Sequence, residues 1–367
     1  MYRCLILACL CLIPISCIYQ EQDQMSYDIE LFNQENLADF LSVCDSVSLE
    51  QPDDHMISEI SKFQCDSEYF YLQDRDVILV YNRKGDYVSK VSRKGRAGNE
   101  YISITDYCVY GNRIYVLSNP QRKINIYEID GNYVGSIPLN DWYHNLSVED
   151  NYIMLYSERS NSQKYDIIKI DFNGNVLDKF LPFRKDCGVM YKISPFNRVA
   201  DGEYLLTLPF DHRLYLLSDK KCLPFCSIDV KDISEMLPRE LDKLEYDEIK
   251  KLVDGKDYLR RIIYASKSGD KLNLIVEVYL KDRAIRDVLC QIDLLSNRVS
   301  SYLCGEDLDP KFPYINAPAV IVGDMIYSVL DPLYMHNVNN LINGTASDVN
   351  VNDIGSHWVY TYKFATE

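Results

Sequence analysis

The feature of this sequence that most constrains its fold is a hairpin motif that recurs along the chain. Each copy has an apolar strand, a turn with glycine at the fifth position and a second strand, and the copies span residues 81–91, 127–137 and 170–180. The turn glycines, Gly85, Gly131 and Gly174, lie 46 and then 43 residues apart. A β-hairpin that recurs about every 40–50 residues is typical of a propeller, in which one blade has this length, or of a similar array. The motif therefore predicts an all-β repeat architecture.

The later copies lose the glycine but keep the spacing. A turn at Asp219 follows Gly174 by 45 residues, and the next clear hairpin turns at Ser296, 77 residues further on. The excess of about 32 residues has a candidate in the segment around 231–262, where apolar residues recur at helical spacing among Glu, Asp and Lys. We expect one or two helices to be inserted there between blade strands.

Strands rich in tyrosine and β-branched residues precede the hairpins, and such residues pack well on a pleated surface. Five of these strands, together with a closing strand at 358–364, predict six blades. Blades stack into a ring because a single blade cannot bury both of its faces. We expect a strand near 46–50 to close the ring by completing a sheet with the C-terminal strands. The predicted fold is an all-β, six-bladed β-propeller with a helical insertion around residues 231–262.

The N-terminus has the features of an export signal. Residues 1–16 combine Arg3 with an apolar run that is too short to span a membrane. Cys17 follows a small residue as in a bacterial lipobox, in which the cysteine is lipidated and becomes the mature N-terminus. Pro14 stands where the usual lipobox has an aliphatic residue, and a plain signal peptide cleaved elsewhere is the alternative.

These features divide the chain into three predicted regions. They are a signal peptide at 1–16, a lipid anchor and linker at 17–36, and one propeller domain at 37–367. No later segment is apolar over the length of about 18 residues or more that a membrane span needs. We therefore expect the protein to contact the membrane only through the N-terminal lipid. We also expect it to be a monomer.

Charge and cysteine content narrow the function. The formal net charge of −16 disfavours binding to DNA or RNA, because an acidic chain repels their phosphates, but it does not disfavour neutral ligands. Beyond the N-terminal segment the cysteines are scattered, and Cys222 and Cys226 form the only close pair. No second Cys/His pair with zinc spacing accompanies it, so we interpret these cysteines as small buried strand residues and predict no metal site.

A family resemblance is carried by the run Ser92-Arg-Lys-Gly95-Arg-Ala-Gly-Asn-Glu100-Tyr101. It resembles the Gly-Arg-Gly-Pro-Gly-Glu-Tyr that ends the first full blade of six-bladed β-propeller lipoproteins of Bacteroides-type bacteria, relatives of the NHL-repeat propellers. Gly95, Arg96, Glu100 and Tyr101 match, while residues 97–99 depart from Gly-Pro-Gly. The resemblance extends loosely over residues 37–364. It implies a propeller fold and a location in the cell envelope, as an outer-membrane lipoprotein facing the periplasm or the cell surface.

The loop at 93–101 is the first candidate ligand-binding site. It concentrates cations in an acidic chain, and Arg93 and Arg96 could bind a carboxylate or a phosphate with their guanidinium groups. Glu100 and Tyr101 belong to the same candidate site. The alternative is that Glu100 and Tyr101 hold this loop between two blades by capping neighbouring backbone groups.

Three ring side chains form the second candidate ligand-binding site. Trp142, Tyr143 and His144 follow a blade strand, and aromatic side chains on a loop could stack on a sugar ring. The alternative is that Trp142 lies in the core between blades.

Signatures of catalysis are missing from the sequence. It contains no sialidase-type Ser-Xaa-Asp-Xaa-Gly-Xaa-Thr-Trp box, no Gly-Xaa-Ser-Xaa-Gly elbow and no phosphate-binding glycine loop. A glycosidase needs two carboxylates about 5–10 Å apart. Asp106, Asp211 and Asp331 stand near strand ends and are the acidic catalytic candidates.

Three hypotheses follow for the function. The first is an envelope-anchored propeller that binds a glycan, a peptide or a partner protein across its ring face, without catalysis and without a cofactor. The second is a hydrolase or lyase acting on carbohydrate or a lactone, with acidic residues at the channel and Ca²⁺ as an optional cofactor. The third is a structural subunit of a surface complex that docks through the inserted helices, and it predicts an exposed apolar stripe containing Leu241, Leu244 and Leu252.

Overall fold

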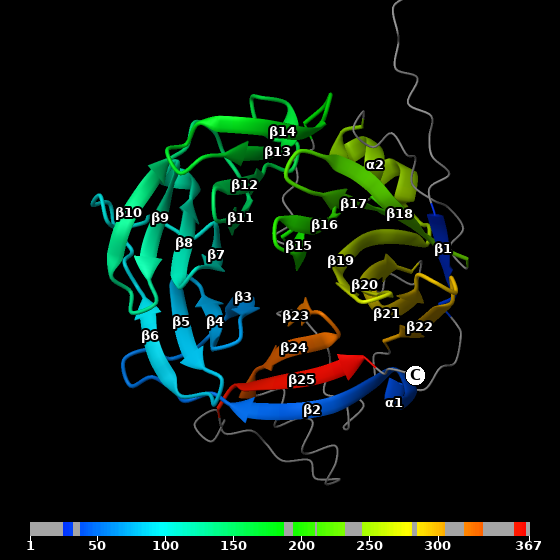
Figure 1. The fold of residues 1–367 in the computed structure, drawn as a ribbon, viewed down its shortest axis with the longest axis horizontal. Helices are drawn as coiled ribbons and strands as arrows, with labels where there is room; N and C mark the ends of the chain where they lie inside the picture. Colours follow the sequence, from blue (N-terminus) through cyan, green and yellow to red (C-terminus); the bar gives the residue numbers. More distant parts are fainter. Residues whose placement is uncertain are drawn as a thin grey trace, which may run out of the picture.

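The structure, a computed structural model, describes residues 25–31, 37–186, 194–209, 211–231, 244–280, 285–304, 319–332 and 356–364. Six β-sheets stand around a central axis as the blades of a β-propeller (Figure 1). The all-β, six-bladed prediction is confirmed. No helix within these residue ranges is long and apolar enough to cross a membrane.

The first three blades each contain four antiparallel strands that follow the chain from the axis to the rim. Blade 1 contains β3 (Ile60–Cys65), β4 (Tyr69–Asp74), β5 (Val77–Asn82) and β6 (Tyr87–Val91). Blade 2 contains β7 (Asp106–Tyr110), β8 (Arg113–Ser118), β9 (Lys123–Glu128) and β10 (Tyr133–Pro138), with the 3₁₀ turn η1 (Asn119–Gln121) before β9. Blade 3 contains β11 (Asn145–Glu149), β12 (Tyr152–Tyr156), β13 (Tyr165–Ile170) and β14 (Val176–Pro182).

The other three blades repeat the arrangement, with additions from the N-terminal region and the helices. Blade 4 contains β15 (Phe196–Ala200), β16 (Glu203–Thr207), β17 (Arg213–Leu217), β18 (Cys222–Val230) and β1 (Met25–Ile29). Blade 5 follows α2 (Tyr246–Val253) and contains β19 (Tyr258–Ser268), β20 (Lys271–Tyr279), β21 (Ile285–Asp293) and β22 (Val299–Leu303). Blade 6 contains β23 (Ala319–Val322), β24 (Met325–Leu330), β25 (Trp358–Phe364) and β2 (Leu41–Ser48), which follows α1 (Leu37–Phe40).

Antiparallel pairing places the connections of each blade at two opposite ends. The turns after the first and third strands lie at one end, and the connections after the second and fourth strands lie at the other, which we call the upper face. The upper-face loops of the first four blades include residues 75–76, 92–105, 119–122, 139–144, 157–164, 208–209 and 211–212. Loops from neighbouring blades meet on this face, which is where a propeller readily builds a binding site.

The ring closes between the two ends of the propeller domain, as predicted. β2 pairs antiparallel with β25, so that Leu41 lies opposite Phe364 and Ser48 lies opposite Trp358. Figure 1 shows β2 as the outer strand beside β25. The fourth strand of blade 6 therefore comes from the start of the domain and the other three come from its end.

A fifth strand on blade 4 comes from the segment that the sequence assigns to the linker. β1 pairs in parallel with β18, from Met25 opposite Cys226 to Ile29 opposite Val230. Ile29 is fully buried in the cluster that fills the space between blades 4 and 5. This strand lies before the predicted domain boundary at residue 37.

The helical insertion is confirmed in α2. Ile249 and Val253 are buried, whereas Leu252 is exposed, so the helix turns one apolar side towards the ring. Residues 232–243 of the predicted insertion lie outside the described residues. Residues 258–262 belong to β19, because they pair with β20 and continue the first strand of blade 5.

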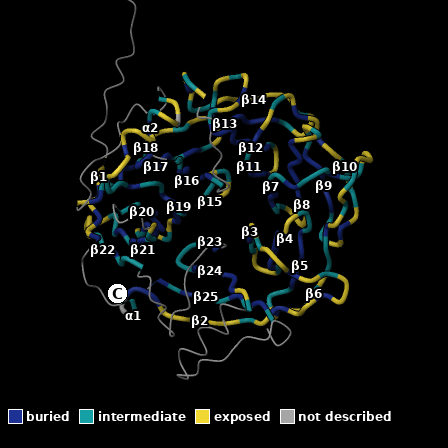
Figure 2. The backbone as a smooth tube through the Cα atoms, turned by 180° about the vertical axis from the view of Figure 1, so that it is seen from behind, coloured by how far each residue is buried: buried dark blue, intermediate teal, exposed yellow. Residues whose placement is uncertain are grey.

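The hydrophobic core lies in the interfaces between blades. The middle strands of the blades are the most deeply buried, as β4 and β5 show, whereas the inner strands β3 and β15 and the outer strands β6 and β14 are partly exposed (Figure 2). Tyrosine suits these interfaces, because its ring packs and its hydroxyl reaches a polar partner. Tyr107 is an example: its buried hydroxyl donates to the carbonyl oxygen of Tyr71 on blade 1, 2.8 Å away.

The repeated turn glycines have two structural reasons. All three have left-handed backbone angles, with φ between 83° and 89°, a region that other residues adopt at a cost. A Cβ atom on each would also lie 2.1–2.5 Å from a carbonyl oxygen in the outer strand of the preceding blade, which is Ser48 for Gly85, Lys90 for Gly131 and Pro138 for Gly174. The recurring glycine therefore marks the place where one blade touches the next.

Gly131→Ala tests this contact. We expect it to lower the free energy of unfolding by about 2–4 kcal/mol, because the left-handed angle costs about 1–2 kcal/mol and the clash with Lys90 adds an overpacking cost. The control is Gly111→Ala, since Gly111 has φ of 56° but open space around the Cβ position. Urea unfolding followed by circular dichroism measures both variants. Equal losses would contradict the blade contact.

Candidate functional site

Most of the predicted ligand-binding residues lie on the upper face of blades 1–3. Hydrogen bonds join three of its segments: Ile102 N donates to Gln121 Oε1 (3.1 Å), Leu139 N donates to the Arg122 carbonyl oxygen (2.7 Å), and Tyr143 N donates to Asn119 Oδ1 (3.1 Å). We call the surface formed by residues 93–102, 119–123 and 139–144 the upper rim. It is continuous and supported by main-chain contacts.

Glu100 and Tyr101 shape the first loop of the upper rim. The Tyr101 side chain is fully buried, and its hydroxyl donates to the Asp76 carbonyl oxygen at 2.6 Å. Burial raises the pKa of Tyr101 to about 12. A Glu100 carboxylate oxygen accepts from the Ala97 amide at 2.8 Å. Both side chains thus contact their own loop and the end of blade 1, as the structural alternative for them expects.

The two arginines of this loop differ in their surroundings. Arg93 Nε donates to the Gly131 carbonyl oxygen at 3.2 Å, which ties the loop to the turn of blade 2. Arg96 is exposed, and within the described ranges its side chain makes neither an ion pair nor a hydrogen bond. Arg96 is therefore the arginine of the loop that is available to a ligand.

The ring side chains of the second candidate site point in different directions. Trp142 is 46% exposed and Tyr143 only 2%, so the core position considered for Trp142 is taken by Tyr143. Asp141 Oδ1 accepts from the Trp142 amide at 2.9 Å, and Asp141 Oδ2 accepts from the Ser162 amide at 2.8 Å. Asp141 thus holds the backbone of Trp142 and ties its loop to the loop that carries Ser162. Burial lowers the pKa of the third residue, His144, below its usual value.

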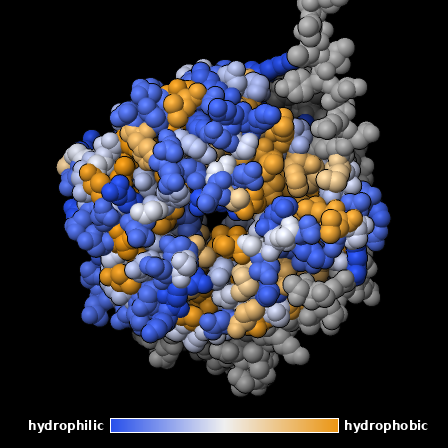
Figure 3. All heavy atoms as spheres, viewed as in Figure 1, coloured by the Kyte–Doolittle hydropathy of each residue, from blue (hydrophilic) through white to orange (hydrophobic). Residues whose placement is uncertain are grey.

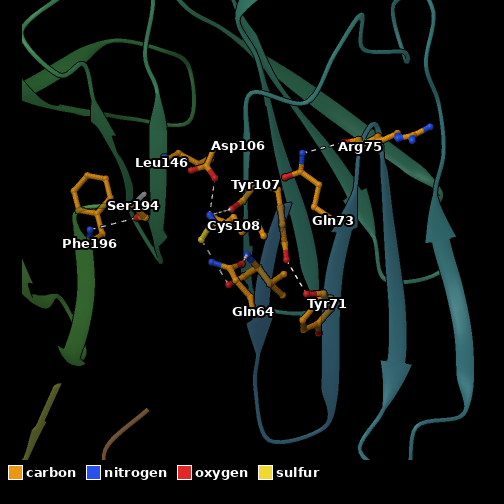
Figure 4. A network of polar contacts seen from close by, with 12 residues as sticks. Gln64, Tyr71, Gln73, Arg75, Asp106, Tyr107, Cys108, Leu146, Ser194 and Phe196 are labelled. Atoms are coloured by element: carbon orange, nitrogen blue, oxygen red, sulfur yellow. Dashed lines mark hydrogen bonds and ion pairs between the residues drawn. The ribbon is translucent and has the colours of Figure 1, made fainter. Parts of the chain in front are cut away.

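Asp106 joins three blades near the axis (Figure 4). Its buried carboxylate accepts from Lys62 Nζ of blade 1 at 2.6 Å and from the Leu146 amide of blade 3 at 3.0 Å. Gln64 likewise accepts from the Val109 amide at 3.2 Å. The inner strand of each blade is an edge strand whose amides need partners, and side chains of the preceding blade supply them. Asp106 is thus occupied by contacts between blades.

The other two acidic candidates lie apart from Asp106. Asp211 on blade 4 accepts from Arg213 through both oxygens, at 2.8 and 2.7 Å, and from the Tyr215 hydroxyl at 2.8 Å. Asp331 on blade 6 is exposed. Burial lowers the pKa of His357, and the negative charge of Asp331 partly opposes this shift. Asp106, Asp211 and Asp331 lie on blades 2, 4 and 6, and the described contacts do not join them.

A pair of acids that sequence reasoning missed lies on blade 5. Glu277 and Asp287 are opposite each other on β20 and β21. Glu277 accepts from Arg260 at 2.7 Å and from Arg261 at 3.0 Å. Burial, and then the charge of Glu277, raise the pKa of Asp287 to about 6. The sequence signal was the unusual charge in otherwise apolar strands, but the register that pairs the two acids is visible only in the fold.

The described residues form neither a metal-binding cluster nor a disulfide. Within the described ranges, no group of three or more His, Cys, Asp and Glu side chains could hold a metal ion. The cysteines described are free thiols, including Cys222 and Cys226. These two lie four residues apart on β18, roughly 13 Å along a strand, which is too far for a disulfide.

The fold and the upper rim define a six-bladed propeller with a loop-built surface on one face. Within that class the chain belongs to the DUF4934 family, described as a domain of unknown function, whose family model matches residues 27–339. No curated protein matches the chain.

Two solved structures show the same fold. One, of an exported protein from Bacteroides fragilis, is 15% identical with a TM-score of 0.71 and covers 93% of this chain and 100% of that chain. The other, of a member of the DUF4221 family from Bacteroides vulgatus, is 10% identical with a TM-score of 0.55 and covers 90% of this chain and 99% of that chain. The expected resemblance to propellers of Bacteroides-type bacteria is confirmed.

Asp287→Asn tests the environment of the acid pair. Because the pKa of Asp287 in the folded protein is about 6 and the ordinary pKa of an aspartate is 3.8, ionisation destabilises the fold as the pH rises from about 4 to 6. The variant cannot ionise, so we expect it to be more stable than the parent by about 2–3 kcal/mol at pH 7–8 and equally stable near pH 4. Urea unfolding at several pH values measures the difference. The control is Asp178→Asn on the exposed face of β14, which should show no such trend. A gain that is constant with pH would contradict the assignment.

Proposed function

We propose that the protein is an exported, envelope-anchored binding protein that holds a saccharide on the upper rim of blades 1–3. The observation that carries this proposal is Trp142, a large indole side chain that is nearly half exposed on a loop fixed by hydrogen bonds. The face of the ring in Figure 3 is mostly hydrophilic, and Asp141 and Ser162, which hold the Trp142 loop, are polar. A flat aromatic ring in polar surroundings is suited to stack on the apolar face of a sugar while neighbouring groups bind its hydroxyls.

The rim is prepared for binding before a ligand arrives. Asp141 ties the residue before Trp142 to the loop of Ser162, and Tyr143 anchors the residue after it in the core. Little conformational entropy is therefore lost when a ligand contacts the indole, which favours affinity. Tryptophan is also among the side chains that most often dominate binding energy.

The described carboxylates favour binding over hydrolysis. Asp106 and Asp211 are buried and fully engaged by cations and amides. Glu277 is held by two arginines, so neither oxygen is free to attack a sugar. Asp287 alone has the raised pKa of a general acid, and a glycosidase needs a second, available carboxylate.

The docking hypothesis also loses support from α2. The predicted apolar stripe contained Leu241, Leu244 and Leu252, of which Leu241 lies outside the described residues. Leu244 is half-buried, and its carbonyl oxygen accepts from Arg159 Nη1 of blade 3 at 3.0 Å. The helix therefore uses its apolar side and its start to contact the ring, and only Leu252 is exposed.

The first test uses the chain from Met25 onwards, which contains every described strand. Oligosaccharides are screened by thermal shift, since a ligand that binds only the folded state raises its melting temperature. We expect a saccharide that also changes tryptophan fluorescence. Trp142→Ala should weaken its affinity about tenfold, or about 1.4 kcal/mol, without changing the melting temperature of the free protein.

The matched control is Leu295→Ala, which removes an exposed apolar side chain from a turn of blade 5. It should bind the saccharide like the parent. The proposal fails if no saccharide raises the melting temperature, or if Trp142→Ala binds as tightly as the parent.

Envelope anchoring is tested separately. Residues 1–24, including Cys17, lie outside the described residues, and the support is the lipobox-like sequence together with the exported relative from Bacteroides fragilis. We expect the protein to incorporate a labelled fatty acid in its host. The Cys17→Ser variant should lose this label and should no longer be found in the membrane fraction. Acyl label that persists in Cys17→Ser would contradict lipidation at this residue.

A further inference from the structure

The acidic groups of the upper rim are already occupied by the protein itself. Glu100 accepts from an amide of its own loop, and Asp141 accepts from the Ser162 amide and hydroxyl. Next to the rim, Asp76 forms an ion pair with Lys94 at 2.5 Å. These hydrogen bonds orient the carboxylates toward the protein, and the upper rim still carries more positive than negative charge, with five Arg and Lys residues against two Asp and Glu residues.

Two of the remaining cations are occupied and two are not. Arg93 and Lys123 donate to backbone carbonyl oxygens, at 3.2 and 2.8 Å, and hold loops together. Arg96 and Arg122 are exposed, and no described residue forms an ion pair or a side-chain hydrogen bond with them. The upper rim therefore presents two guanidinium groups that no described residue binds, although the net charge of the chain is −16.

A basic residue with a left-handed backbone angle occupies the same turn position in three blades, and one of the three, Lys164, forms an ion pair with Asp186. Arg122 has a left-handed φ of 48°, and Arg75 and Lys164 have φ of 53° and 60° in the corresponding turns of blades 1 and 3. Glycine or asparagine adopts this angle at lower cost. In each turn a basic side chain stands on the upper face just before the third strand of the blade.

Trp142 and Arg122 belong to neighbouring segments. The loop that carries Trp142 begins at Leu139, whose amide donates to the Arg122 carbonyl oxygen at 2.7 Å. The turn of Arg122 also accepts a hydrogen bond from the loop of Arg96, through Gln121. The Trp142 indole and the unpaired guanidinium groups of Arg96 and Arg122 therefore belong to three connected segments of the upper rim.

We infer that the saccharide bound by the upper rim is anionic and carries carboxylate or sulfate groups, which Arg96 and Arg122 bind while Trp142 stacks on a sugar ring. This inference rests on the proposed function and names its ligand class. A guanidinium group presents paired N–H donors that match the two oxygens of such an anion. The net negative charge of the chain does not prevent this, because salt screens charges beyond about 8–10 Å.

The test measures affinity by calorimetry for two acidic oligosaccharides, an oligogalacturonate and a sulfated galactan, on the purified protein. Each is compared with its neutral counterpart, the methyl ester and the desulfated form. We expect the acidic forms to bind more tightly and to lose affinity as the salt concentration rises. Arg96→Gln and Arg122→Asn should each weaken binding of the acidic forms about tenfold and leave the neutral forms unchanged. Asparagine is chosen at 122 because it tolerates the left-handed angle.

The matched control is Lys84→Gln, which removes an exposed cation from the opposite end of blade 1. If it weakens binding as much as Arg122→Asn, the effect is one of net charge and the inference is wrong. Equal affinity for acidic and neutral forms would overturn the inference but leave saccharide binding intact. Binding of an acidic peptide that Trp142→Ala does not affect would instead identify a polypeptide surface and overturn it as well. If no saccharide binds at all, the proposed function fails and the inference falls with it.

Discussion

Contact between one blade and the next is the constraint on which this structure depends. At the outside of the ring, the turn of each early blade approaches a carbonyl oxygen of the preceding outer strand so closely that only glycine fits. Near the axis, Asp106 and Gln64 bind amides of the next inner strand and so satisfy an edge that would otherwise be open. Neighbouring blades are thus joined by close packing at the outside of the ring and by hydrogen bonds near the axis. Neither kind of contact requires a single central core.

The same junctions give the upper rim its character. Two of its three segments, 93–102 and 139–144, connect one blade to the next, so the groups that hold two blades together also orient the loop side chains. Tyr101 and Tyr143 are used as anchors, while Arg96 and Trp142, a few residues away, remain exposed. A surface built in this way needs little rearrangement to bind, and its specificity follows from the few side chains that the scaffold does not use.

The sequence predicted the parts of the fold that leave a local mark. A glycine required by a left-handed turn repeats with the blade, so Gly85, Gly131 and Gly174 revealed the period and the ring. The site was less visible, because adjacent residues such as Trp142 and Tyr143 differ in exposure only once the loop is folded. Partners far apart in the chain, such as Lys62 with Asp106, depend on the packing of blades and leave no local pattern.

Closure of the ring by β2 and β25 has a consequence for how each molecule folds during its synthesis. The strand at Leu41–Ser48 emerges early from the ribosome, and its partner at Trp358–Phe364 is made more than 300 residues later. Until then blade 6 lacks a middle strand, and the exposed strand edges of an open ring are able to pair with other chains. Such a molecule is best kept unfolded until its synthesis is complete, which is the condition that translocation of an unfolded chain across a membrane would impose.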